Sequence, residues 1–260
     1  MALNKWRIKW KIGSLSKNLP ITVYKTIDST NTQAKLYAQG ENTCNAVFIS
    51  SEQTAGRGRL GRSFISEGGK GLYMSLLLKG KLDPSYATSL TTYMAVVAAR
   101  AIEHCSGTDV KIKWVNDLYI GGKKASGILT EAKASEDGEV LDYAVVGIGI
   151  NLLKQEFDSE VKNIATTLED ECGKRVDINR LAAMIIKAFF KNLNSVGAKD
   201  IADEYRSRSF LIGERVTVIK PTAQYEATVT GITDKCELLL SLSDGTTETL
   251  STGEVSVRKI

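Results

Sequence analysis

Hydrophobic positions in the first 208 residues switch repeatedly between a two-residue and a 3.6-residue period, which predicts a mixture of strands and helices. Short apolar or alternating runs predict strands at 21–24, 46–49, 72–78, 110–114, 123–131 and 143–151. Apolar spacing with polar starts and glycine stops predicts helices at 30–40, 83–107, 177–194 and 199–208. Residues 1–20 are basic, and their pattern fits a short helix and an edge segment equally well.

The pattern changes at Gly213, where helical periodicity ends. Short strands follow at regular spacing, at 216–219, 227–229, 237–242 and 255–257, with turns at Pro221, 234–235, 244–245 and Gly253. This arrangement is typical of a small all-β barrel. We therefore expect an α+β protein with two domains: residues 1–211 form a mixed β-sheet with helices packed on it, and residues 212–260 form the barrel.

Composition and charge exclude several classes of protein. The net charge of +4 over 260 residues permits an anionic ligand and does not demand a nucleic acid. The longest apolar runs are far shorter than a membrane span, and the N-terminus lacks an apolar signal core, so we expect no membrane partner and no export. The four cysteines lie far apart without a C-x-x-C pair, which favours free thiols in a reducing cytoplasm over a zinc site.

The chain contains a single histidine, His104, at the end of a predicted helix. A histidine there more often complements the helix dipole than activates a nucleophile. Any chemistry is therefore expected to run on lysine, arginine, aspartate and asparagine side chains.

Residues 53–64, which we call the Gly-Arg loop, carry three glycines and three arginines between Gly56 and Arg62. Glycines let backbone N–H groups approach an anion closely, and guanidinium groups supply fixed pairs of donors. The loop also matches G-x-G-x-x-G, but residues 66–71 cannot open the helix that a dinucleotide site needs. A solvated basic loop is an equally good interpretation of this segment alone.

A second group of polar residues surrounds a predicted hairpin. Alternation from residue 110 to residue 114 places Lys113 on the polar face, and Asn116 and Asp117 follow at the strand exit. The turn at 121–122 returns Lys124 towards Asp117. Such a group fits a polyanion with its magnesium, although a lysine beside an aspartate is also a common structural ion pair.

Two further segments have both a structural and a functional interpretation. Thr30 and Gln33 form a capping-box pattern at a strand-to-helix turn, where hydroxyls and N–H groups could also meet a ligand. In the strand at 143–151, Gly147, Gly149 and Asn151 share one face. Bare backbone on one face suits close approach of a flat ligand, or equally the packing of a helix.

Taken together, these segments resemble the motifs of biotin protein ligases, from about residue 21 to the C-terminus. The matching motifs are 29-Ser-Thr-Asn-31, 56-Gly-Arg-Gly-Arg-x-Gly-Arg-62, 113-Lys-Trp-x-Asn-Asp-117, 124-Lys-x-x-Gly-Ile-Leu-129 and 147-Gly-x-Gly-Ile-Asn-151, with 253–258 as the terminal barrel. The resemblance implies a class II synthetase-like catalytic domain that binds biotin and ATP with Mg²⁺. It also implies biotinyl-5′-AMP as an intermediate and transfer of biotin to a lysine of a biotin carboxyl carrier protein.

The resemblance also implies roles for individual residues. Biotin would be bound by Ser29, Thr30, Asn31, Gln53, Arg57, Gly58, Arg59, Lys124 and Gly127. The nucleotide would be bound by Arg59, Arg62, Phe64, Lys113, Asn116, Gly147, Gly149 and Asn151. The catalytic group would be Lys124, Arg59, Lys113 and Asp117, with Asp117 also serving Mg²⁺. The Gly-Arg loop would order over the ligand and exclude water from the adenylate.

The sequence departs from the family pattern in two respects. Val115 stands where many relatives have proline, and Phe64 stands where an aromatic residue, often tryptophan, stacks near adenine. Only about twenty residues precede the first matching strand, which is too short for the DNA-binding module of some relatives, so we expect no DNA partner. A homodimer is one of the assembly states that the family includes.

Three rival interpretations fit parts of the sequence. A lipoate ligase would use similar adenylate chemistry but lacks the Gly-Arg-Gly-Arg pattern. A nucleic-acid-binding module would use the arginines and the barrel as a basic surface, which the mild net charge disfavours. A non-catalytic metabolite sensor would bind the same ligands without forming an adenylate.

Overall fold

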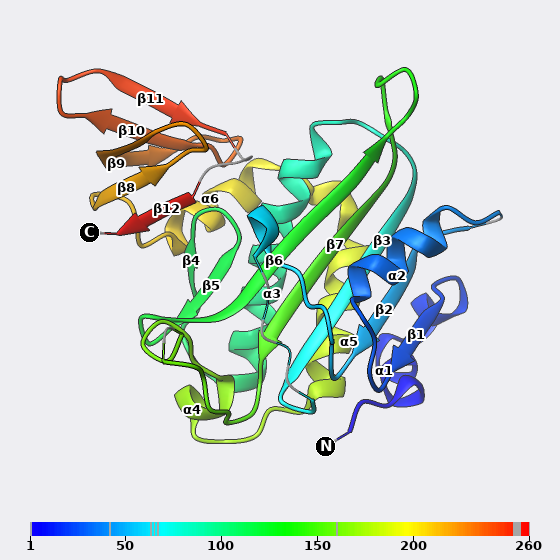
Figure 1. The fold of residues 1–260 in the computed structure, drawn as a ribbon. Helices are drawn as coiled ribbons and strands as arrows, with labels where there is room; N and C mark the ends of the chain where they lie inside the picture. Colours follow the sequence, from blue (N-terminus) through cyan, green and yellow to red (C-terminus); the bar gives the residue numbers. More distant parts are fainter. Residues whose placement is uncertain are drawn as a thin grey trace.

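The computed structural model describes residues 2–41, 43–62, 64, 66, 68–159, 161–251 and 256–259. Seven strands form a mixed sheet in the order β1-β2-β3-β7-β6-β5-β4, in which β1 and β2 are parallel and the other pairs antiparallel (Figure 1). The strands are β1 (Ile21–Tyr24), β2 (Ala46–Ser50), β3 (Gly71–Leu82), β4 (Lys111–Lys113), β5 (Asp117–Ile120), β6 (Lys123–Ala134) and β7 (Leu141–Asn151). The predicted α+β class is confirmed.

Alternation along β7 separates the two faces of this sheet. Val146, Ile148 and Ile150 lie in the main core, which also contains residues of α1 (Lys5–Ile12), α3 (Tyr86–Ser106) and α5 (Ile178–Lys191). Tyr143 and Val145 point to the opposite face and pack with α2 (Thr30–Ala38) in a smaller cluster. Because Gly147 and Gly149 continue the face of Tyr143 and Val145, the glycine face of β7 lies on the side of α2 and the Gly-Arg loop.

Two helix ends lie where their terminal residues predict. Asp177 caps α5 by accepting hydrogen bonds from the N–H groups of Asn179 and Arg180, and Gly107 ends α3 in the left-handed conformation. The predicted helix at 199–208 is α6 (Lys199–Arg208). A five-residue helix, α4 (Leu168–Cys172), was not predicted.

Of the two alternatives for residues 1–20, a short helix and an edge segment, the structure contains the helix. Asn4 caps α1, and Ile8 and Ile12 are buried beneath it, where α1 packs against α5. A short 3₁₀ turn, η1 (Gly13–Lys17), then leads into β1. Within the described residues, none of the helices has both the length and the apolar composition needed to cross a bilayer.

The C-terminal part folds as a five-stranded antiparallel sheet in the order β11-β10-β9-β8-β12. Its strands are β8 (Arg215–Ile219), β9 (Gln224–Ile232), β10 (Leu238–Leu242), β11 (Thr247–Leu250) and β12 (Ser256–Lys259). This sheet stands apart from the larger one, beside α6 (Figure 1). The small all-β unit is confirmed with one additional strand, β11, and the predicted turn at Gly253 lies outside the described residues.

Candidate active site

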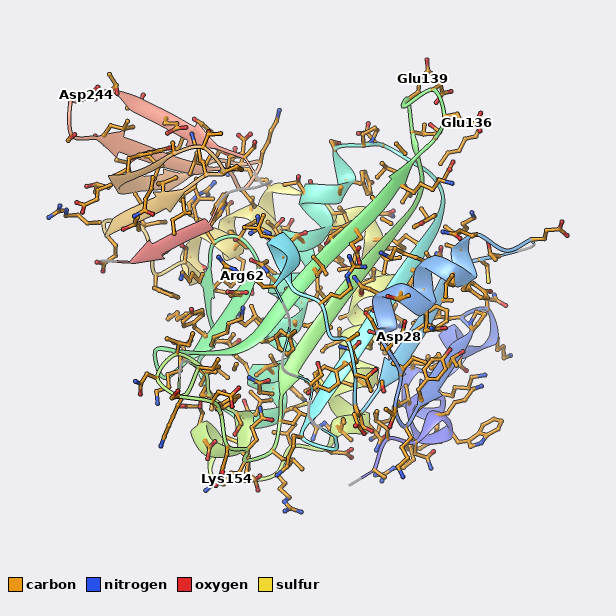
Figure 2. All side chains as sticks on the ribbon, in the orientation of Figure 1. Asp28, Arg62, Glu136, Glu139, Lys154 and Asp244 are labelled. Carbon is orange, nitrogen blue, oxygen red and sulfur yellow. The ribbon has the colours of Figure 1, made fainter. Side chains whose placement is uncertain are left out.

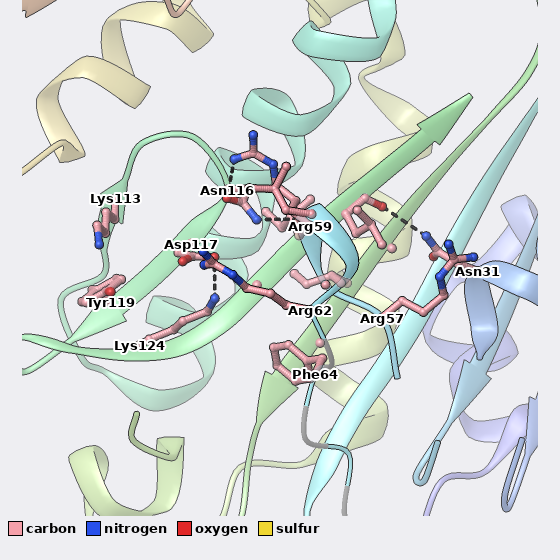
Figure 3. Close-up of a pocket in the computed structure, with 18 of the residues that line it drawn as sticks. Asn31, Arg57, Arg59, Arg62, Phe64, Lys113, Asn116, Asp117, Tyr119 and Lys124 are labelled. Carbon is pink, nitrogen blue, oxygen red and sulfur yellow. Dashed lines mark hydrogen bonds and ion pairs between the residues drawn. The ribbon is translucent and has the colours of Figure 1, made fainter. Parts of the chain in front are cut away.

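A cavity of about 750 Å³ opens on the glycine face of the sheet, between the start of α2, the Gly-Arg loop and the β4–β5 turn. Figure 3 shows side chains from these segments converging on it. Almost every residue predicted for the site lines this cavity: Ser29, Thr30, Asn31, Gln53, Arg57, Gly58, Arg59, Arg62, Phe64, Lys113, Asn116, Asp117, Lys124, Gly127, Gly147 and Gly149. The separate motifs, although distant in sequence, thus line a single cavity, as expected for one site.

Asn151 is the predicted residue that does not line the cavity. Its side chain is buried at the end of β7, where its amide donates a hydrogen bond of 3.1 Å to the carbonyl oxygen of Thr166. In this structure Asn151 therefore supports the loop after β7, and its contact with a nucleotide stays a prediction.

The start of α2 forms one wall of the cavity, but not through a capping box. Ser29 is the N-cap residue, and Gln33 binds the Asp28 carboxylate instead of reaching back to its own helix start. The Thr30 N–H donates to Gln53 Oε1 at 2.7 Å, and the Thr30 hydroxyl donates to the same oxygen at 3.1 Å. The capping-box prediction is wrong because Gln53, from the Gly-Arg loop, replaces the local partner and ties this loop to α2.

Asn31 is the centre of a buried polar network behind this wall. Its amide donates to Glu131 Oε2 at 2.8 Å and to the Leu129 carbonyl at 3.3 Å, and its oxygen accepts from the Ser75 hydroxyl at 2.6 Å. Glu131 also pairs with Lys35 at 2.7 Å and with Arg57 at 3.5 Å. Both polar atoms of the Asn31 side chain thus form hydrogen bonds within the protein, and its direct contact with biotin stays a prediction.

Glu131 was not predicted from the sequence, although it joins α2, β6 and the Gly-Arg loop. Burial raises its pKa, but hydrogen bonds from Lys35 and Asn31 outweigh burial and hold the pKa below its usual value. The carboxylate therefore stays ionised and can hold Arg57 at the cavity edge.

Replacing Gly147 by alanine is expected to disrupt this network. A Cβ atom at Gly147 would lie 2.1 Å from the Asn31 oxygen, and the bonds to Glu131 and Ser75 oppose any retreat of Asn31. We expect the variant to lose about 1–3 kcal/mol of unfolding free energy in urea titrations. Gly231→Ala is the matched control, because a Cβ there meets its nearest atom at 3.6 Å. Equal stability of the two variants would contradict the predicted clash.

The remaining bare backbone is covered by an aromatic ring from the Gly-Arg loop. A Cβ atom at Gly149 would lie 2.8 Å from the Phe64 ring, and one at Gly127 would lie 3.2 Å from it. Gly127 and Gly149 are register partners on β6 and β7, so together they form the flat floor under this ring. The glycine face therefore accommodates a planar group, and in this structure that group is Phe64.

The other end of the cavity carries the cations. Lys124 Nζ lies 2.7 Å from Asp117 Oδ1, and Arg59 donates to Asn116 Oδ1 at 3.3 Å (Figure 3). Burial lowers the pKa of Arg59, and the nearby Asp117 charge opposes that shift. Lys124 is fixed through its backbone as well, because its N–H donates to the Ile164 carbonyl and its own carbonyl accepts from Thr166.

Two aromatic residues that the sequence did not indicate complete this end. Lys113 Nζ lies 5.8 Å from the centre of the Tyr119 ring, and Phe210 packs against Tyr119 with ring centres 5.1 Å apart. Burial raises the pKa of Tyr119 to about 12, so the hydroxyl is neutral at physiological pH. Strand alternation at 117–120 could have pointed to Tyr119, but Phe210 comes from the junction before β8.

The β4–β5 turn is held by the far part of the chain. The Trp114 indole N–H donates to the Cys236 carbonyl at 2.9 Å, and the Tyr205 hydroxyl donates to the Val115 carbonyl at 3.0 Å. Both bonds are buried. Because Lys113, Asn116 and Asp117 flank these anchored residues, α6 and the C-terminal sheet fix the position of the cation end.

Replacing Trp114 by phenylalanine is expected to loosen this turn. The change keeps an aromatic ring but leaves the buried Cys236 carbonyl without its donor, at a cost of about 1–2 kcal/mol in stability. Displacement of Lys113 and Asp117 should also lower kcat/KM for ATP by about ten-fold in an assay of the adenylation that the sequence resemblance implies. Trp10→Phe, at an exposed tryptophan, is the control. Unchanged kinetics for Trp114→Phe would show that the turn keeps its position without the bond.

Comparison with known proteins identifies the family. Residues 23–151 match the Biotin/lipoate A/B protein ligase family, and residues 211–258 match the biotin protein ligase C-terminal domain. The chain is 32% identical to the bifunctional ligase/repressor BirA of Bacillus subtilis (strain 168), over 85% of this chain and 69% of that protein. It is 30% identical to the biotin–[acetyl-CoA-carboxylase] ligase of Paracoccus denitrificans, over 82% of this chain and 90% of that protein.

A solved structure agrees with the sequence relatives. The biotin protein ligase from Aquifex aeolicus in complex with biotin and ATP superposes with a TM-score of 0.78 at 28% identity, and the match covers 93% of this chain and 99% of that one. Fold, domain matches and relatives all agree. The chain therefore belongs to the biotin protein ligase family.

Proposed function

We propose that this protein attaches biotin to a lysine of a biotin carboxyl carrier protein, with ATP as the second substrate. In the first step a biotin carboxylate oxygen attacks the α-phosphorus of ATP, the bond to pyrophosphate breaks, and biotinyl-5′-AMP forms. In the second step the amine nitrogen of the carrier lysine attacks the acyl carbon, AMP leaves and the nitrogen loses a proton.

The observation that carries this proposal is the convergence of Arg59, Lys113 and Lys124 on one cavity. Adenylation brings a carboxylate and a phosphate together, so its barrier is largely the repulsion between two anions. Cations that are already fixed in place lower that barrier without reorganising during the reaction. A histidine base is not needed for this step, which suits a site whose lining contains no histidine.

We assign the α2 end of the cavity to biotin. Ser29, Thr30, Gln53 and Arg57 supply hydroxyl, amide and guanidinium groups for a ureido ring, and Asn31 holds the wall behind them. Gly58 and Gly127 would lie along the tail, which leads towards Lys124. Lys124 would then meet both the carboxylate and the phosphate charge that develops beside it.

We assign the cation end and the Phe64 floor to the nucleotide. Arg59, Arg62 and Lys113 would bind the phosphates, and Asn116 would contact the base. Phe64 offers a ring for stacking above Gly127 and Gly149. The Gly-Arg loop would close over the intermediate and exclude water, which a hydrolysable adenylate requires.

Asp117 fits the requirements of a magnesium ion that arrives with ATP. Mg²⁺ is commonly bound by one or two carboxylates together with substrate phosphates, and no cluster of three or more acidic, histidine or cysteine ligands occurs within the described ranges. We propose that Asp117 supplies that carboxylate, and that the ion screens phosphate charge when bound. In the second step the same carboxylate would orient the incoming lysine.

The proposal extends to location and organisation. All four cysteines are free thiols, which supports a cytoplasmic location.

We place the boundary between the biotin- and ATP-binding domain and the small β domain after residue 211. Analytical ultracentrifugation with and without biotin would decide between a monomer and a homodimer.

Biotin-dependent exchange of labelled pyrophosphate into ATP tests the reaction, with lipoate as a parallel acid. Exchange with biotin alone is expected. Exchange with lipoate alone would contradict the assigned substrate, and exchange with neither acid would contradict adenylation itself.

A further inference from the structure

The positive charge of this protein is concentrated at its N-terminus. Residues 1–27 contain Lys5, Arg7, Lys9, Lys11, Lys17 and Lys25 and no acidic residue, whereas the whole chain has a net charge of +4. Residues 28–260 therefore carry a net charge of −2. Among the described residues Lys5, Lys9, Lys11 and Lys17 have no carboxylate partner, so this charge is not neutralised by ion pairs within the fold.

Helix α1 presents two tryptophans on the outside of this basic segment. Ile8 and Ile12 are fully buried against the body of the protein, while Trp6 is 75% exposed and Trp10 is 80% exposed. The two indoles lie one turn apart on the face of α1 that points away from the protein. Lysines lie on both sides of them, with Lys9 Nζ 5.9 Å from the Trp6 ring and Lys11 Nζ 5.7 Å from the Trp10 ring.

The helix beneath α1 extends the same charge. Between Ile178 and Lys191, α5 contains Arg180, Lys187 and Lys191 and no acidic residue, and its N-cap residue Asp177 is paired with Arg7 of α1 at 3.3 Å. The acidic residues of the β6–β7 turn lie elsewhere: Figure 2 shows Glu136 and Glu139 at its tip, at the opposite end of the molecule from α1. The α1 surface therefore forms a cationic face with an aromatic ridge.

We propose that this α1 surface docks the protein on an anionic phospholipid surface. Indole rings favour the headgroup region of a bilayer, and lysines beside them pair with lipid phosphates. This is surface association and needs no spanning segment. It therefore revises the expectation of no membrane partner, which rested on the short apolar runs and on the absence of an apolar signal core. It concerns neither the substrate nor the reaction proposed above.

The geometry favours lipid over the other anionic partners. A protein partner would need a preformed groove for a convex ridge, whereas lipid headgroups adapt to it. Nucleic-acid bases would stack on the indole faces, and one face of each indole is approached by an ammonium group, Lys9 over Trp6 and Lys11 over Trp10. The cavity opens on the opposite face of the sheet from α1 and α5, so a docked protein would keep its active site open to a carrier protein.

Vesicle binding tests the proposal on the full chain. Vesicles of phosphatidylcholine alone are compared with vesicles containing about 30% phosphatidylglycerol, a composition that supplies the negative surface potential. Co-sedimentation is expected with the anionic vesicles only, and added salt should reduce it. Tryptophan emission should shift to the blue on binding, because Trp6 and Trp10 are exposed while the third tryptophan, Trp114, is already buried.

Two variants locate the surface. Trp6→Ala/Trp10→Ala should lower the partition coefficient by about ten-fold or more and remove the emission shift. Lys9→Gln/Lys11→Gln should weaken binding, whereas Lys81→Gln/Lys235→Gln removes the same charge from exposed positions elsewhere and should not. Unchanged pyrophosphate exchange by all three variants would show that they are folded.

Several outcomes would overturn the proposal. These are no binding to anionic vesicles, binding that survives the tryptophan double variant, or an emission shift with oligo(dT) or polyglutamate in the absence of vesicle binding. The last result would instead identify a nucleic acid or an acidic protein as the partner of the α1 surface. A failure of biotin-dependent exchange in the parent protein would leave the vesicle result unaffected.

Discussion

Replacing Lys124 by alanine is expected to lower biotin-dependent pyrophosphate exchange by about 10²–10³-fold while weak binding of biotin survives. Lys124 lies 2.7 Å from Asp117 and is fixed by two backbone hydrogen bonds to the 164–166 segment, so its ammonium group is in place before the substrates react. The groups assigned to the ureido ring remain intact in this variant. Exchange kinetics and isothermal titration with biotin measure the two effects separately.

Lys123→Ala is a matched control for this result. Lys123 is the neighbouring residue on β6, but it is exposed and does not line the cavity. The Lys123→Ala variant should therefore exchange pyrophosphate at the rate of the parent protein. If Lys124→Ala retained the parent rate as well, Lys124 would not be the group that stabilises the developing charge.

Replacing Arg59 by alanine is expected to release the adenylate into solution. Arg59 extends from the Gly-Arg loop to Asn116 on the β4–β5 turn, so it links the loop to the cation end of the cavity. Without this link the loop should open more often, and the retention time of biotinyl-5′-AMP should fall by about ten-fold or more. Rapid gel filtration of the enzyme after reaction with labelled ATP measures the fraction retained.

Arg215→Ala is the control for Arg59→Ala. Arg215 lies on β8, is exposed and pairs with Glu226 within the C-terminal sheet. Its loss should leave the retention of adenylate unchanged. Retention by Arg59→Ala as long as that of the parent would contradict the role of the loop as a cover.

Much of the fold could be predicted because the long elements have regular hydrophobic spacing. The stripe of α3 and the alternation of β7 identify both elements and their buried faces. Strand β11 was missed because Leu250 is its one buried residue, so it shows no alternation of polar and apolar positions. The predicted hairpin at 121–122 is present, with β5 and β6 as its arms. The turn that separates β4 from β5 was not predicted, because it depends on Tyr205 and Cys236, which come from much later in the chain.

The residues that line the cavity could be predicted from sequence motifs, but the residues that hold them in position could not. The predicted residues came from short segments with unusual composition, and all of them except Asn151 line one cavity. Glu131 and Phe210 belong to no such segment, because a single carboxylate in a strand or a phenylalanine after a helix is unremarkable in sequence. Their importance arises from contacts with Asn31 and Tyr119, which only the folded chain creates.

The strand order of the large sheet has a consequence for how the chain folds during synthesis. Strands β3 and β7 pair along most of their length, yet α3 and three strands separate them in sequence. The edge of β3 that pairs with β7 therefore stays unpaired until residue 151 has left the ribosome. Unpaired strand edges promote aggregation. Helix α1 waits longer still, because Ile8 and Ile12 pack against α5, which ends at Lys191. Helix α1 is thus synthesised before α5 but packs into place only after it.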